Sequence, residues 1–258
     1  MAVEYSREDN VGYITLNNPP ANSYDMSFME ERGECVDAAA GNDGARAVIV
    51  RSASERFFSA GADIKAFNRN PPEKNMDMIR TAHENLARIA GIPKVFIAQI
   101  GATALGGGLE MALACDLRFG AEGEYYLGLP ESNLGLLPGN GGTQRLPRLI
   151  GASKALDLMI TGRMLSPAEA HQLGILDRLF PAERLEEETL KYARGLASGA
   201  AGAIGSIKLA VRRGIDRPLK EGLEIERELV EPLFSSDEAK EGIGAFMEKR
   251  KPEFSKQT

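Results

Sequence analysis

The chain has 258 residues, of which 43% are apolar and 26% are charged, a composition typical of one large or two small water-soluble domains. Its formal net charge of -6 and its pI near 5.2 argue against nucleic acid or an anionic membrane surface as the main partner, because both need a concentrated basic face. No run approaches the roughly 18 apolar residues of a membrane span, and the acidic first ten residues resemble neither a transit peptide nor a secretion signal.

Strand and helix patterns alternate through the first half of the chain. Residues 3–5 and 12–16 flank Asp9 and Asn10 and predict a hairpin. A strand covered on both faces is predicted by the uninterrupted apolar run at 47–50, and the segments at 94–100 and 115–119 look similar. Helices are expected at 26–40 and 76–90, the second of which is closed by Gly91 and Pro93. This alternation predicts an α/β core.

From residue 153 onward the patterns are mostly helical. The expected helices cover residues 155–160, 167–173, 184–196, 205–211, 219–233 and 238–249, and only 175–180 resembles a strand. The small residues at 197–202 resemble a linker, so we divide the chain into a core over residues 1–197 and a helical region over 198–258. Leu219, Leu223, Val230 and Leu233 form an apolar stripe, which faces either this chain's core or a neighbouring subunit.

The common sequence templates for phosphate, dinucleotide and metal sites do not fit. The glycine run at 101–108 lacks the lysine of a phosphate-binding loop, and the run at 139–144 lacks the last glycine of the dinucleotide fingerprint. His83 and His171 are the only histidines, and neither belongs to a zinc motif, so we expect no metal. Cys35 and Cys115 are far apart, which favours buried thiols in a reducing compartment, the cytoplasm.

Two glycine-rich stretches instead lead to glutamates. Gly106 to Gly108 precede Glu110 at what reads as a helix start, where the first amides are unpaired and face the preceding loop. Small residues at 57–64 follow another strand and could supply a second donor, while Glu131 adds a carboxylate from a loop. Taken alone, each glycine loop is a tight turn and each glutamate a solvated or helix-start acid. Together they favour acid–base chemistry on a polarised carbonyl.

At this point the chain resembles the enoyl-CoA hydratase/isomerase (crotonase) family over essentially its whole length. The motifs that carry the resemblance are N-P-P-A-N at 18–22, S-A-G-A-D-I at 59–64, A-L-G-G-G-L-E at 104–110, P-E at 130–131, L-G-L-L-P-G-N-G-G-T-Q-R-L at 134–146, T-G at 161–162 and F-M-E-K-R-K-P at 246–252. Each motif is weak alone, but the ordered set is highly specific. The resemblance implies a spiral of ββα units followed by a helical trimerisation region, assembled as a homotrimer or a dimer of trimers that acts on acyl-CoA thioesters.

The resemblance also implies the roles of individual residues. The backbone N–H groups of Ala60 and Gly107 would form an oxyanion hole for the thioester oxygen, and Glu110 and Glu131 match the two catalytic carboxylates of the hydratase branch. We assign water to Glu110 and the C2 proton to Glu131, with the reverse assignment left open. The implied substrate-binding residues are Ala60, Gly61, Ala62, Asp63, Ile64 and Gly107. Asp63 either bonds local amides or contacts the CoA moiety, and Asp116 is interpreted as structural.

The expected activity is hydration of a 2-enoyl-CoA to a 3-hydroxyacyl-CoA, with no metal and no cofactor beyond the CoA of the substrate. A double-bond isomerase on the same scaffold is the alternative, because it needs only one acid to shuttle a proton. A non-catalytic relative that binds acyl-CoA or RNA is a further alternative, against which the acidic net charge and the paired glutamates speak. The segment at 122–126 is one residue longer than is usual in the family, and the region at 67–78 varies within it, so the sequence does not specify the acyl chain length.

Overall fold

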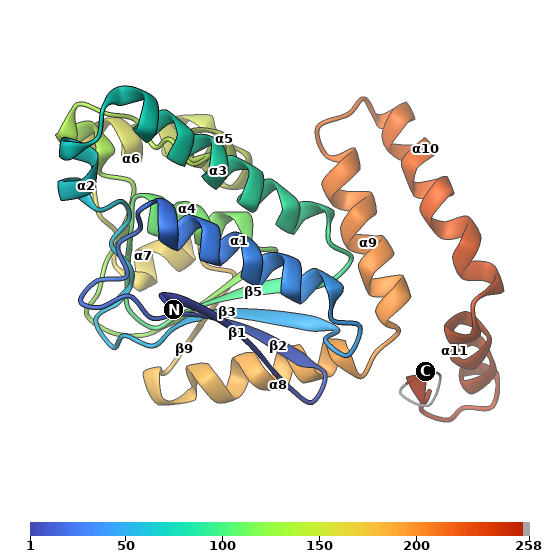
Figure 1. The fold of residues 1–258 in the computed structure, drawn as a ribbon. Coiled ribbons are helices and arrows are strands. Elements are labelled where there is room, and N and C mark those ends of the chain that lie inside the picture. The colour runs from blue at the N-terminus through green and yellow to red at the C-terminus, as the bar shows by residue number, and fades with distance from the viewer. Residues whose placement is uncertain (255–258) are drawn as a thin grey trace.

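A mostly parallel six-stranded sheet forms the centre of the protein. The computed structural model describes residues 1–254 (Figure 1), and the strand order in this sheet is β1-β2-β3-β5-β7-β9. The strands are β1 (Val3–Glu8), β2 (Val11–Leu16), β3 (Ala47–Ser52), β5 (Val95–Ile100), β7 (Leu117–Ala121) and β9 (Arg178–Phe180). Only β1 and β2 pair antiparallel, which confirms the predicted hairpin. The apolar runs predicted as buried strands become β3, β5 and β7, although β7 begins two residues later than expected.

Three very short strands form a second, wholly parallel sheet that the sequence analysis did not anticipate. They are β4 (Phe57–Ser59), β6 (Thr103–Leu105) and β8 (Leu127–Gly128), in the order β4-β6-β8. The segment beginning at Ala60 follows β4, Gly106 follows β6, and Pro130 with Glu131 follows β8 closely. Because the carboxyl ends of parallel strands meet at one edge, this small sheet brings three distant segments together.

Helices cover both faces of the main sheet. In Figure 1, α1 (Met26–Gly41) and α3 (Pro72–Gly91) lie on one side of the strands and α8 (Leu185–Ala197) lies on the other. The helix predicted at 76–90 is confirmed, although it begins four residues earlier, and its Ala82, Leu86 and Ile89 are buried. Strands covered on both sides can be continuously apolar, and Val48 and Phe96 are indeed fully buried in β3 and β5.

The remaining helices of the core are short, and one of them, the helix that begins at Gly107, packs against strands β4 and β6 of the second sheet. They are α2 (Ile64–Arg69), α4 (Gly107–Ala114), α5 (Gly142–Ile150), α6 (Ala152–Thr161) and α7 (Pro167–Gln172), with the 3-10 turns η1 (Glu131–Leu134) and η2 (Ala182–Arg184). Helix α4 is buried along its whole length. It packs against β4 and β6 on one side and contacts α3 and α5, so the Gly106–Glu110 segment lies between the second sheet and these helices.

The chain ends in helices that extend away from this body. Figure 1 shows α9 (Ala201–Gly214) beside the core, with α10 (Leu219–Val230), η3 (Glu231–Ser235) and α11 (Asp237–Met247) farther out. The apolar stripe on α10 does not face this chain's core, because Leu219 and Leu223 are 78% and 42% exposed. Among residues 1–254, no helix is long and apolar enough to cross a membrane.

Helix α9 is tied to the core by buried and partly buried charges. The Asp116 carboxylate lies 2.8 Å from Lys208 Nζ and 3.0 Å from Arg212 Nη2, and it also accepts a hydrogen bond from the Phe96 amide. Lys208 donates further to the carbonyl of Ile89 and is almost fully buried. The structural interpretation of Asp116 is therefore confirmed: it joins the end of α4 and strand β5 to the first of the outer helices.

Candidate active site

Glycine residues let α4 begin directly against the end of strand β4. A Cβ atom on Gly108 would lie 2.2 Å from the carbonyl oxygen of Ser59, far closer than any side chain permits. Gly106, the residue before α4, has φ of +53°, and Gly61 has φ of +88°, a region that favours glycine. A Cβ atom on Gly61 would lie 3.2 Å from the Gly107 nitrogen. The segments after β4 and β6 are thus in close contact.

Two backbone amides at this contact are free to bind an anion. Gly107 is the first residue of α4, and within residues 1–254 its N–H group donates to no protein acceptor. The same holds for the N–H group of Ala62. The residues on either side of Ala62 bond to Tyr24, because Tyr24 N donates to Gly61 O and Asp63 N donates to Tyr24 O, both at 2.9 Å. The N–H group of Ala62 itself therefore points away from Tyr24.

The donor role predicted for Ala60 does not fit this structure. Its N–H group donates to the carbonyl oxygen of Ala21 at 2.9 Å and is therefore already bonded. Ala62, expected only as a substrate-lining residue, has the free amide of this segment. The sequence did not reveal the difference, because it depends on how residues 21 and 24 pair with this segment.

Glu110 lies inside the protein in a cradle of backbone amides. It is 1% exposed, and its Oε1 accepts hydrogen bonds from the amides of Asn140 at 2.8 Å and Gly142 at 2.7 Å. Its pKa is raised from 4.5 to about 7, chiefly by burial and to a smaller extent by the nearby Glu131, while the two amides oppose the rise. The glycine-rich run at 139–142 therefore holds a carboxylate, a role that sequence analysis missed although the run itself was visible.

Glu131 approaches the same place from the end of β8, the strand next to β6. It is the first residue of η1, and a Cβ atom on Gly106 would lie 2.8 Å from its Oε1. Its Oε2 is buried and has no hydrogen-bond partner within the described residues 1–254. Burial raises the pKa of Glu131 as well. The structure therefore brings both predicted acids to the start of α4, beside the free Gly107 amide.

The other predicted binding residues border this centre. Asp63 caps helix α2, and its Oδ1 accepts from the amides of Lys65 at 2.8 Å and Ala66 at 3.3 Å. Of its two possible roles, the structure thus shows the bonding of local amides. Ile64 is 52% exposed at the start of the same helix. Among residues 1–254, no three His, Cys, Asp or Glu side chains are grouped so as to hold a metal ion.

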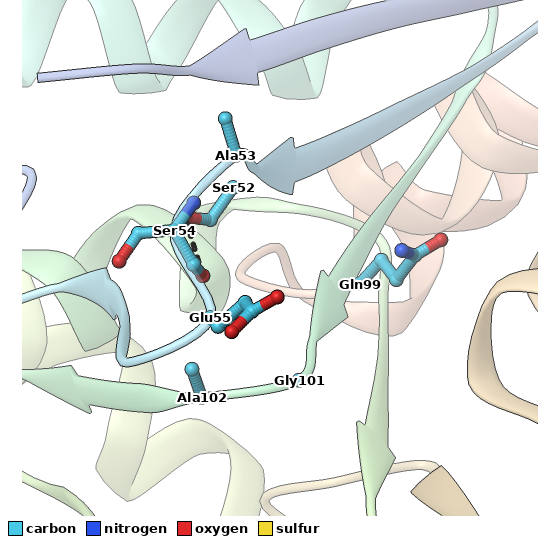
Figure 2. A pocket seen from close by; sticks show the side chains of 7 residues that line it. All are labelled: Ser52, Ala53, Ser54, Glu55, Gln99, Gly101 and Ala102. Carbon is cyan, nitrogen blue, oxygen red and sulfur yellow. Dashed lines mark hydrogen bonds between the residues drawn. The ribbon is translucent and has the colours of Figure 1, made fainter. Parts of the chain in front are cut away.

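A separate pocket lies where β3 and β5 end and holds none of these groups. Figure 2 shows its lining, which comprises Ser52, Ala53, Ser54, Glu55, Gln99, Gly101 and Ala102. Ser52 is already bonded, since its Oγ donates to Phe57 O at 2.6 Å and accepts from Ser54 N at 2.9 Å. With a single acid, this pocket offers none of the paired chemistry found at α4.

Comparison with known proteins places this geometry in a family. The sequence model of the family described as enoyl-CoA hydratase/isomerase matches residues 6–257. The chain belongs to the enoyl-CoA hydratase/isomerase family. It is 38% identical over 258 residues to a Bacillus subtilis protein named probable enoyl-CoA hydratase, with 98% of each chain covered.

Solved structures agree on the fold. An enoyl-CoA hydratase from Geobacillus kaustophilus is 43% identical with a TM-score of 0.97, covering 98% of this chain and 96% of that one. One from Bacillus anthracis is 35% identical with a TM-score of 0.93, covering 98% of each. The protein thus has the crotonase fold expected from its motifs, with a parallel sheet and carboxy-terminal helices. The family includes both hydratases and isomerases.

Proposed function

We propose that this protein is an enoyl-CoA hydratase, which adds water across the 2,3 double bond of a 2-enoyl-CoA thioester to give a 3-hydroxyacyl-CoA. The observation that carries the proposal is the placement of two carboxylates, Glu110 and Glu131, beside the unpaired amide of Gly107. The resemblance to proteins named as hydratases supports the same choice.

In the proposed reaction the thioester oxygen accepts hydrogen bonds from the amides of Ala62 and Gly107. Negative charge develops on this oxygen when water attacks C3, and each preorganised donor of this kind contributes about 3 to 4 kcal/mol of transition-state stabilisation. The dipole of α4 adds about 0.3 to 1 kcal/mol for an anion at its amino end. Ala62 replaces Ala60 in this role because the Ala60 amide is bonded to Ala21.

The two acids divide the proton transfers. Glu110 takes a proton from water as the C3–O bond forms, and Glu131 gives a proton to C2 as the enolate collapses, so one water is added and no electron is gained or lost. The amides of Asn140 and Gly142 support the charged form of Glu110 that a base requires. Burial raises the pKa of Glu131, and its Oε2 has no hydrogen-bond partner among residues 1–254, so this oxygen is available to carry the proton that goes to C2. This chemistry uses no cofactor other than the CoA that the substrate carries.

The outer helices suit the proposed trimer or dimer of trimers. Large apolar residues on or beside α9, α10, η3 and α11 are left mostly exposed by this chain; they are Ile207, Val211, Ile215, Leu219, Phe234 and Phe246. A surface of this kind marks an interface. Two buried free thiols, Cys35 and Cys115, are consistent with the cytoplasm that we propose as its compartment.

The decisive assay follows the loss of conjugated thioester absorbance with crotonyl-CoA and with longer or branched enoyl-CoAs. Glu110→Gln and Glu131→Gln should each lower kcat by about 100-fold or more and leave the binding of butyryl-CoA, a saturated thioester, nearly unchanged. Full activity in either variant would overturn the assigned role.

Two other outcomes would replace the proposal. The isomerase would be established if the protein converted a 3-enoyl-CoA to its 2-enoyl isomer without hydration, and if only one of the two variants lost this activity. Thioester binding without any turnover would indicate a binding protein.

A further inference from the structure

Tyr24 is a buried residue that contacts both segments with a free amide, the one that contains Ala62 and the one that contains Gly107. It is 3% exposed and precedes α1, far from both segments in sequence. Its main chain holds the residues on either side of Ala62, because Tyr24 N donates to Gly61 O and Tyr24 O accepts from Asp63 N, both at 2.9 Å. The direction of the Ala62 amide is therefore set by the backbone of Tyr24.

The hydroxyl group of Tyr24 reaches the other half of the site. It accepts a hydrogen bond from Asn140 Nδ2 at 2.6 Å, and a Cβ atom on Gly107 would lie only 1.9 Å from the hydroxyl oxygen. Asn140 is 1% exposed, and its own backbone amide donates to Glu110 Oε1 at 2.8 Å. One side chain thus contacts the residue that carries the oxyanion donor and the residue that holds the acid.

We propose that Tyr24 is a positioning residue that fixes the oxyanion donors and Glu110 relative to each other, its main chain through Ala62 and its hydroxyl through Asn140. The inference rests on the proposed hydratase function for its kinetic consequence, but the geometry exists independently of the substrate. Displacement of a catalytic group by about 1 Å can lower the rate by about 100-fold. The partners that orient metal ligands in metalloenzymes contribute about 10- to 100-fold, and we take this as the scale for a positioning residue.

Ordinary core packing does not account for the hydroxyl group. The Tyr24 ring packs near Phe28, with ring centroids 6.4 Å apart, and a phenylalanine would make the same contact. Burying a hydroxyl group is unfavourable unless it finds a partner, and here the partner is the side chain of the residue that cradles Glu110. Removing only the hydroxyl group therefore tests the positioning role of Tyr24 and leaves the packing of its ring in place.

Tyr24→Phe is the test, and Tyr125→Phe is the matched control. Tyr125 is also a buried tyrosine, but its hydroxyl lies 2.9 Å from Ile100 O and 2.8 Å from Ala121 O, away from both acids. Tyr24→Phe should lower kcat for crotonyl-CoA by about 10- to 100-fold with KM changed by less than about 2-fold. Asn140→Ala should have a similar effect, and the double variant should be no slower than the slower single variant.

A titration independent of turnover completes the test. Carbon-13 NMR of labelled glutamate in wild type and variants reports the ionisation of Glu110, which is faced by Glu131, by Arg145 and by the amides of Asn140 and Gly142. Looser positioning of the Asn140 amide weakens support for the carboxylate, so the Glu110 pKa should rise in Tyr24→Phe and stay constant in Tyr125→Phe.

The outcomes separate the two proposals. An inactive wild type would sink the hydratase proposal, while the titration would still decide the role of Tyr24. An unchanged kcat together with an unchanged Glu110 titration in Tyr24→Phe would overturn the positioning role, and so would equal effects of Tyr24→Phe and Tyr125→Phe.

Discussion

The ionised Glu110 side chain should lower the free energy of unfolding by an amount that depends on pH. Its pKa is about 7 in the folded chain, whereas an unfolded chain gives the ordinary value of 4.5. Between these values the folded protein binds more protons than the unfolded one, so the free energy of unfolding falls as pH rises. At about 1.4 kcal/mol for each pH unit, the ionised carboxylate costs about 3 kcal/mol above pH 7.

Replacement of Glu110 by glutamine removes this cost. The glutamine oxygen can still accept from the amides of Asn140 and Gly142, and the side chain stays neutral. Glu110→Gln should therefore match wild type near pH 4.5 and exceed it by about 3 kcal/mol at pH 8, which is about 6 to 12 °C in Tm for a chain of this size.

Urea denaturation followed by circular dichroism at several pH values measures the difference directly. Glu84→Gln, which changes an exposed glutamate on α3, is the control and should match wild type throughout. A Glu110→Gln protein that is no more stable than wild type at pH 8, or whose advantage is the same at pH 5 and pH 8, would refute the reasoning.

Two further predictions concern groups outside the site. Asp116→Ala should lower the free energy of unfolding by about 3 to 5 kcal/mol, because it leaves the buried Lys208 without its carboxylate partner. The control is Asp237→Ala, which breaks an exposed pair with Lys240 and should cause no measurable change in the same denaturation experiment. Equal effects of the two substitutions would contradict this account. Burial raises the pKa of Cys35 to about 11 and that of Cys115 to about 12, so Ellman's reagent at pH 8 should label both thiols only after unfolding in urea, and rapid labelling of the native protein would show that the thiols are accessible.

The long elements of the fold followed from periodicity, whereas the short ones did not. Helix α3 and strand β3 carry enough apolar residues in sequence to identify them. Strands β4, β6 and β8 have only two or three residues each and exist through pairing with one another, so no local pattern predicts them. These three strands nevertheless create the edge on which the site is built.

The site itself was predictable in its residue types and less so in its hydrogen bonds. Glu110 and Glu131 were recognisable from their motifs, and the structure brings them together. The choice between Ala60 and Ala62 as donor depends on bonds to residues far away in sequence. The glycine run that contains Asn140 and Gly142 was likewise visible in the sequence. Only the fold shows that its amides donate to Glu110, about 30 residues earlier in the chain.

The ionic anchor of α9 also decides what the protein displays on its outside. Lys208 and Arg212 are four residues apart and share one side of the helix, so their contacts with Asp116 prevent rotation about the helix axis. One residue earlier, about 100° around the helix, the aliphatic row Ile207, Val211 and Ile215 is held facing outward at 63%, 57% and 72% exposure. The ion pairs with Asp116 therefore fix the direction in which this exposed aliphatic row faces. A change that breaks the ion pairs should also reorient the row.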